Sequence, residues 1–135
     1  MIEQKIAELQ KQHADTFEIT AEKGWLRIKS KKPTYTDHPA INGPAYLDYN
    51  INYDDHREPE YSDLSRNVWL RTKAGKGFMH VSYCGGLGIW QVSELGEPIA
   101  ASDISSESKK LVEDWLKTMD DYVLKHIPGL EEALK

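Results

Sequence analysis

The chain has 135 residues, of which 39% are hydrophobic and 29% are charged, with a net charge of −5 and a single cysteine. This length and composition are typical of one soluble globular domain, so we expect residues 1–135 to form a single domain. The acidic balance argues against a nucleic-acid binder. One cysteine excludes an internal disulfide and a multi-cysteine zinc site. No apolar run approaches the roughly 18 residues of a membrane span, and no signal-peptide core is present. We therefore expect a cytoplasmic protein without a membrane partner.

Two amphipathic helices are predicted, one at each end of the chain. Residues 2–13 carry apolar side chains at helical spacing, namely Ile2, Ile6 and Leu9. Residues 106–127 form the second helix, which Asp103 or Ser105 can cap. Its predicted apolar stripe consists of Leu111, Trp115, Met119, Tyr122, Val123 and Ile127.

Residues 17–30 predict a β-hairpin with a two-residue turn at Lys23-Gly24. This turn pairs Glu18 with Lys29, and it places apolar residues opposite apolar residues along the rest of the hairpin. One side of the second strand then displays Trp25 and Arg27.

Residues 45–53 alternate between apolar and polar side chains, which predicts a half-buried strand. The segments 31–44 and 54–66 on either side lack periodicity and contain proline, so we expect two long loops there. Loops of this length in a compact domain are candidate functional elements.

Residues 68–93 predict a meander of three antiparallel strands with turns at 74–77 and at Gly85-Gly86. The first turn would pair Trp69 with Ser82, and the second would pair Val81 with Trp90 and Ser82 with Ile89. Both registers place an apolar set of side chains on one face, with Trp90 included. The opposite face displays Trp69, Arg71, His80, Ser82 and Gln91.

The order of helix, strands and helix predicts an α+β fold. We expect a two-layer sandwich with an antiparallel meander sheet of about five to six strands and both helices packed on one face of it. The other face of the sheet would meet solvent or a partner.

A docking surface is the main functional candidate. Residues 46–63 hold six acids, one base and four tyrosines; tyrosine is enriched at interfaces and acids steer a basic partner. The alternative is a merely solvated loop beside a strand. The outward tryptophans Trp25 and Trp69 could each bury about 200 Å² against a partner. The alternative is that the 31–44 loop folds over them. The predicted partner-binding residues are Trp25, Arg27, Tyr46, Asp48, Asp54, Asp55, Glu58, Tyr61, Trp69, Arg71 and His80.

Catalytic and metal-binding signals are weak. His80 lies about 13 Å from Cys84 and about 6–7 Å from Ser82 along an extended strand, whereas a nucleophile and its base need about 3 Å. We therefore expect no catalytic pair among these three residues, and no phosphate loop or nucleophile elbow occurs. Asp54, Asp55, His56 and Glu58 cluster oxygen and imidazole groups, but we predict neither a metal nor a cofactor.

The helix–sheet–helix order, with the strand Asn67-Val68-Trp69-Leu70-Arg71-Thr72, resembles frataxin-type iron–sulfur assembly proteins. In that family a similar V-W-L-x-T strand presents an exposed tryptophan to a partner, so the resemblance implies a metal-handling function with Trp69 on the surface. Two features depart from the family. The first helix is mixed in charge rather than strongly acidic, and residues 31–66 have no counterpart.

Three functional hypotheses follow. The first is a non-enzymatic protein-binding module, in the class of inhibitors and immunity proteins, that docks a protein through the open sheet face and the acidic tyrosine-rich segment. That segment favours a basic partner. The second is frataxin-like metal handling or iron–sulfur assembly. The third is a small-ligand binder or enzyme whose pocket is built from distant histidines, namely His38, His56 and His80.

Overall fold

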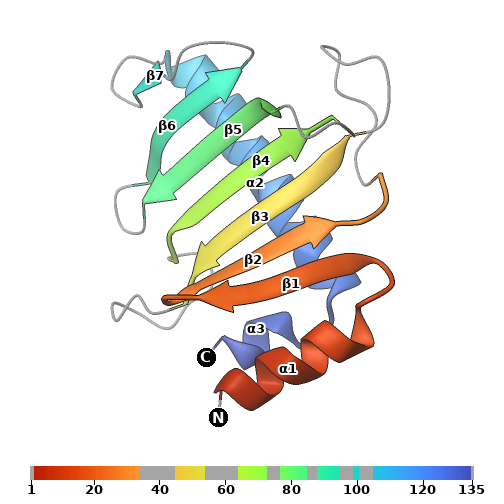
Figure 1. The fold of residues 1–135 in the computed structure, drawn as a ribbon. Coiled ribbons are helices and arrows are strands. Elements are labelled where there is room, and N and C mark those ends of the chain that lie inside the picture. The colour runs from red at the N-terminus through yellow and green to blue at the C-terminus, as the bar shows by residue number, and fades with distance from the viewer. Residues whose placement is uncertain are drawn as a thin grey trace.

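The computed structural model describes residues 2–33, 45–53, 64–72, 77–84, 88–94, 99–100 and 105–134. Within these residues, seven antiparallel strands lie side by side in chain order in one sheet (Figure 1). The strands are β1 (Phe17–Glu22), β2 (Trp25–Ser30), β3 (Tyr46–Asn52), β4 (Arg66–Arg71), β5 (Gly77–Cys84), β6 (Gly88–Glu94) and the two-residue β7 (Ile99–Ala100). The predicted antiparallel meander is therefore confirmed.

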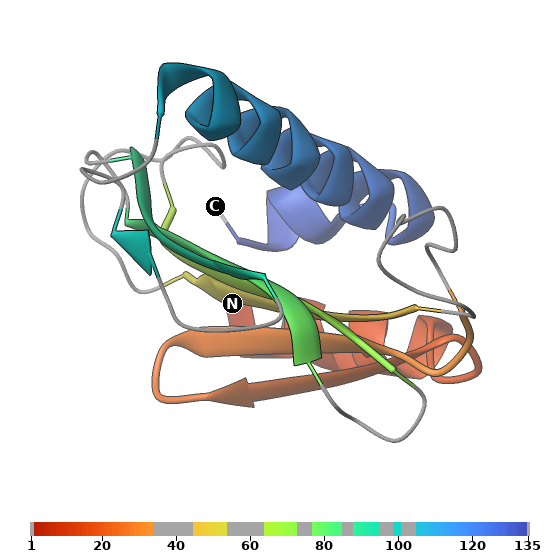
Figure 2. The same cartoon turned by 90° about the horizontal axis from the view of Figure 1, so that it is seen from above.

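The helices take different positions against the sheet. The long helix α2 (Ser106–His126) crosses one face (Figure 2). The shorter α1 (Ile2–Gln12) lies at the β1 edge of the sheet, next to α3 (Leu130–Ala133) (Figure 1). Ser105 caps α2, because its hydroxyl accepts a hydrogen bond from the Ser108 amide at 3.2 Å. The predicted α+β class, with terminal helices packed against the sheet, is confirmed. In the part of the chain described here, no helix is both long and apolar enough to cross a membrane.

The first hairpin has the register that the sequence predicts, with Glu18 opposite Lys29 and Glu22 opposite Trp25. Both turn residues have positive φ, 52° at Lys23 and 84° at Gly24. This is the backbone of a type I′ turn, whose twist matches that of the two strands it joins. A two-residue turn leaves no freedom in the pairing, so the whole hairpin could be predicted from it.

The β4–β5 and β5–β6 pairings differ by two residues from the predicted ones. Trp69 lies opposite His80 instead of Ser82, and Val81 lies opposite Val92 instead of Trp90. Both pairings contain a bulge or irregularity, which turn length alone does not reveal. A shift of two residues preserves the face of each side chain, so Trp69 and His80 still share a face. The side chains of Trp90 and Gln91 lie outside the described set.

One residue, Ile89, lies on the opposite face of the sheet from the predicted one. The pairing predicted from the sequence placed Ile89 opposite Ser82, on the polar face. The structure instead places Ile89 opposite Tyr83, and its side chain is buried with 2% exposure. The irregularity between Ser82 and Tyr83 is the physical reason, because it lets one more residue of β6 pass between two paired positions.

The core lies between the sheet and α2. From α2 it receives Leu116, Met119 and Val123, and the prediction that Leu111 belongs to this stripe is wrong because Leu111 is 70% exposed. At about 100° per residue, the three buried side chains point within about 60° of one another, whereas Leu111 lies about 80° outside them. The sheet contributes mainly Leu26, Ile28, Leu47, Tyr49, Ile51, Val68, Leu70 and Val81.

A buried polar cluster joins α2 to the sheet. The Tyr49 hydroxyl of β3 donates a hydrogen bond to Asp120 of α2, and the Arg66 Nε of β4 lies 3.1 Å from the same carboxylate. The Arg66 side chain is only 3% exposed, and its guanidinium lies 4.5 Å from the centre of the Tyr83 ring. Burial raises the pKa of Asp120, while Arg66 and Tyr49 oppose that rise. The cluster therefore fixes where α2 sits on the sheet.

Two adjacent aspartates test this role. Asp120→Asn removes a charge partner of buried Arg66, so we expect the free energy of unfolding to fall by about 2 kcal/mol. Asp121→Asn is the matched control, because Asp121 is 62% exposed and pairs with Lys117, which is also exposed; we expect it to change stability little. Urea unfolding followed by circular dichroism measures both, and equal effects would contradict the assignment.

Candidate functional site

The sheet face opposite α2 carries a polar and aromatic surface, which we call the open face. None of the described helices or strands lies over it (Figure 2). Side chains alternate along each strand, so the apolar residues that face α2 leave their neighbours on the open face. Its central side chains are Trp25, Arg27 and Lys29 of β2; Tyr46, Asp48 and Asn50 of β3; Asn67, Trp69 and Arg71 of β4; and His80 and Ser82 of β5.

Asp48 is the centre of the open face, and its carboxylate is held by two arginines. Arg27 donates through Nε to Oδ1 at 2.9 Å and through Nη2 to Oδ2 at 2.7 Å, a bidentate pair. Arg71 donates through Nε to Oδ2 at 3.0 Å, and the Asn50 side-chain amide adds a bond to Oδ1 at 3.1 Å. The Asp48 side chain is only 2% exposed.

The register explains why the two arginines reach the same carboxylate. Asp48 lies on the third of the seven strands, with β2 on one side and β4 on the other. Arg27 is paired with Asn50 and Arg71 with Tyr46, so each arginine is a diagonal neighbour of Asp48, two residues along β3. A long side chain can span this diagonal distance of about 7–8 Å.

The ion pair between Asp48 and Arg27 shifts the pKa of both groups. Burial raises the pKa of Asp48, but the hydrogen bonds from Arg27 and Arg71 outweigh it and leave the pKa below its ordinary value. The hydrogen bond to Asp48 in turn raises the pKa of Arg27. Asp48 is therefore ionised at neutral pH, and one carboxylate with two guanidinium groups gives the cluster one net positive charge.

Trp69 forms an aromatic platform beside this cluster. Its ring is stacked on the imidazole of His80, with ring centres 3.7 Å apart and ring planes 5° apart. The two residues are directly paired across β4 and β5, which brings such rings into contact. The Arg71 guanidinium lies 4.6 Å from the centre of the Trp69 ring. Trp69, half-buried, is thus held by two neighbouring side chains.

Asn67, His80 and Ser82 form a small hydrogen-bonded group next to the platform. The Ser82 hydroxyl donates to Asn67 Oδ1 at 2.6 Å, and His80 Nε2 lies 3.1 Å from the same oxygen. Ser82 Oγ is also 3.3 Å from His80 Nε2. The expectation that His80 and Ser82 are too far apart to interact is wrong, because backbone spacing does not limit side chains that share a face.

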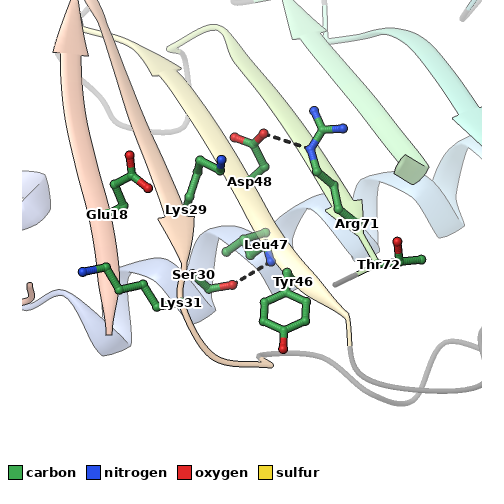
Figure 3. A pocket seen from close by; sticks show the side chains of 9 residues that line it. All are labelled: Glu18, Lys29, Ser30, Lys31, Tyr46, Leu47, Asp48, Arg71 and Thr72. Carbon is green, nitrogen blue, oxygen red and sulfur yellow. Dashed lines mark hydrogen bonds and ion pairs between the residues drawn. The ribbon is translucent and has the colours of Figure 1, made fainter. Parts of the chain in front are cut away.

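Two shallow depressions of about 400 and 380 Å³ meet at Asp48 and Arg71. The first is lined by Trp25, Arg27, Asp48, Asn50, Asn67, Trp69, Arg71 and His80. Figure 3 shows the second, which is lined by Glu18, Lys29, Ser30, Lys31, Tyr46, Leu47, Asp48, Arg71 and Thr72. The open face is thus a broad surface with shallow relief.

The structure brings seven of the predicted partner-binding residues together on the open face: Trp25, Arg27, Tyr46, Asp48, Trp69, Arg71 and His80. Asp54, Asp55, Glu58 and Tyr61 lie outside the described residues. The sequence prediction omitted Asn50 and Asn67, which line the first depression. The alternation that selected Asp48 and Trp69 could have found them, since each lies two residues away on the same strand.

The described residues offer little support for a metal site or for catalysis by cysteine, histidine or serine. No group of three or more metal-ligating side chains occurs among them. Cys84 is a free, half-buried thiol at the end of β5. His38 and His56, which could have joined His80 in a pocket, lie outside the described residues. Among Asn67, His80 and Ser82, the Ser82 hydroxyl donates its proton to the Asn67 amide oxygen rather than to the His80 imidazole.

No protein-family model, curated protein or solved structure matches this chain. The function therefore has to be inferred from the geometry of the site.

The titration of His80 offers a test of this geometry. Burial and the nearby Arg71 charge lower the pKa of His80 from its ordinary value of 6.5, although Asp48 opposes the shift. Unfolded chains then bind this proton at higher pH than folded ones, so stability should fall as pH drops through 6.5 towards the lower folded value. We expect His80→Gln to lose less stability than the wild type between about pH 7 and 5. Denaturant titrations across this range measure the difference, and identical pH profiles would contradict the burial of His80.

Proposed function

We propose that the chain is a non-enzymatic protein-binding module that docks its partner through the open face. The observation that carries this proposal is the depression around Asp48, where two tryptophans, a histidine and two arginines gather on a sheet face that no described element covers. Tryptophan and arginine are the residues most enriched among those that dominate binding energy at protein interfaces.

The rigidity of this surface supports the proposal. Side chains that are already fixed lose little conformational entropy when a partner binds. Trp69 is fixed by His80 and Arg71, and both arginines are fixed by Asp48. The shallow relief also fits a protein surface better than a small molecule, since small-ligand sites are typically deep and bury most of the ligand.

An enzymatic function is the second candidate, and one contact favours it. Ser82 Oγ lies 3.3 Å from His80 Nε2, within reach of a nucleophile and its base. However, Asn67 Oδ1 accepts the Ser82 proton and also lies within hydrogen-bond distance of His80 Nε2. This arrangement satisfies the three groups among themselves, so it supports a structural network on the open face better than a reactive serine.

Two variants, Trp69→Ala and Leu111→Ala, test the docking proposal. A partner is first isolated by chemical crosslinking to the tagged wild-type chain and is then purified. Trp69→Ala should weaken its binding by about 2 kcal/mol, roughly 30-fold in Kd, because it removes the central aromatic surface. Leu111→Ala is the control, since Leu111 is a large exposed side chain on α2, across the molecule from the open face.

Isothermal titration calorimetry measures both affinities, and circular dichroism checks that both variants are folded. A partner that binds Trp69→Ala as tightly as the wild type would show that the open face is not the docking surface.

A further inference from the structure

The exposed groups beside Asp48 on the open face are guanidiniums, opposite in sign to the net charge of the chain, and Glu18 of β1 is an acidic neighbour that helps to raise the pKa of Arg27. The chain carries −5, but the central acid of the open face, Asp48, is withdrawn from solvent. Side-chain exposure is 2% for Asp48, 26% for Arg71 and 46% for Arg27. A partner at this point therefore meets guanidinium groups and not the carboxylate.

Asp48 also has no capacity for a cation from a partner. Its two oxygens already accept four hydrogen bonds, three from arginine nitrogens and one from Asn50. A lysine or arginine brought to this centre would meet a cluster with one net positive charge, and like charges brought together at an interface weaken binding. The expectation of a basic partner rests on the six acids of residues 46–63, and among these Asp48 is the one that lies within the described residues.

Arg27 is suited to bind an anionic side chain. Asp48 engages its Nε and Nη2 atoms, and Nη1 is not part of that pair. The guanidinium is held at a fixed angle by the bidentate pair, so a second carboxylate could bind without reordering the side chain. Trp25 and Trp69 line the same depression as Arg27 and offer apolar surface close to such a contact.

We infer that the open face binds an acidic protein segment, in which an aspartate or glutamate carboxylate pairs with Arg27 and a neighbouring apolar side chain packs against Trp69 and Trp25. This inference deepens the proposed docking function and rests on it. Charge complementarity at Arg27 and Arg71 selects the acidic residue, and the flanking tryptophans select a protein segment with apolar side chains.

A random-peptide phage library panned on the wild-type protein tests the partner chemistry. We expect the enriched peptides to contain more aspartate and glutamate, next to apolar residues, than the starting library. One enriched peptide is then synthesised, and its Kd is measured by fluorescence anisotropy for the wild type and for Arg27→Gln, Arg27→Lys and Trp69→Ala. Lys117→Gln removes the same charge on α2, away from the open face, and is the matched control.

Arg27→Gln should weaken peptide binding about tenfold, because it removes a charge-assisted hydrogen bond to the carboxylate. Lys117→Gln should leave the Kd unchanged. Arg27→Lys keeps the charge but loses the planar fork, so its Kd should lie between those of the wild type and Arg27→Gln. An intermediate value also shows that the loss in Arg27→Gln is not a folding defect, which circular dichroism checks directly.

The other outcomes separate the two proposals. Peptides that lose binding to Trp69→Ala but bind Arg27→Gln normally, or that are rich in lysine and arginine, would keep the docking face and overturn the acidic partner. Peptides that bind every variant equally would overturn the docking function itself. A short single-stranded DNA oligonucleotide is assayed in parallel. Binding of that DNA through Arg27, without enrichment of acidic peptides, would assign the site to phosphate groups and overturn the protein partner.

Discussion

The arrangement of the open face depends on one buried carboxylate. Taking the charge of Asp48 out of water costs several kcal/mol unless strong hydrogen bonds replace the water. Here four donors replace it, and three of them come from arginines on the two neighbouring strands. The same bonds that keep the pKa of Asp48 low also hold Arg27 and Arg71 in place. The position of Trp69 follows in turn, because the Arg71 guanidinium lies against its ring.

Strand β3 carries a polar anchor on each face of the sheet. Asp48 and Tyr49 are adjacent, so their side chains point to opposite faces. Asp48 joins β2, β3 and β4 on the open face, while Tyr49 joins the sheet to Asp120 of α2 on the other. Each anchor replaces a purely apolar contact with a directional one. The register of the central strands and the position of α2 are therefore specified within two consecutive residues.

How much could be predicted from the sequence depended on the length of each connection. The two-residue turn at Lys23-Gly24 leaves one possible pairing, so the hairpin register was correct. The pairings around β5 were off by two residues over most of their length because bulges are not visible in the pattern. Side chains alternate with a period of two, so most faces were still correct, and Ile89, beside the irregularity in the β5–β6 pairing, was the exception. Segment 31–44 separates β2 from β3, and no turn chemistry there could reveal that Asp48 would be the diagonal neighbour of Arg27.

That missing register is also why the sign of the surface charge could not be predicted. Counting acids and bases along residues 46–63 treats Asp48 as one more solvated carboxylate. Across the strands it is instead enclosed by two arginines, whose guanidinium groups are more exposed than the Asp48 carboxylate. Net charge governs long-range behaviour, but screening limits its reach to about 8 Å at physiological salt. At contact distance the local charge is set by exposed groups such as the Arg27 guanidinium rather than by the total of −5.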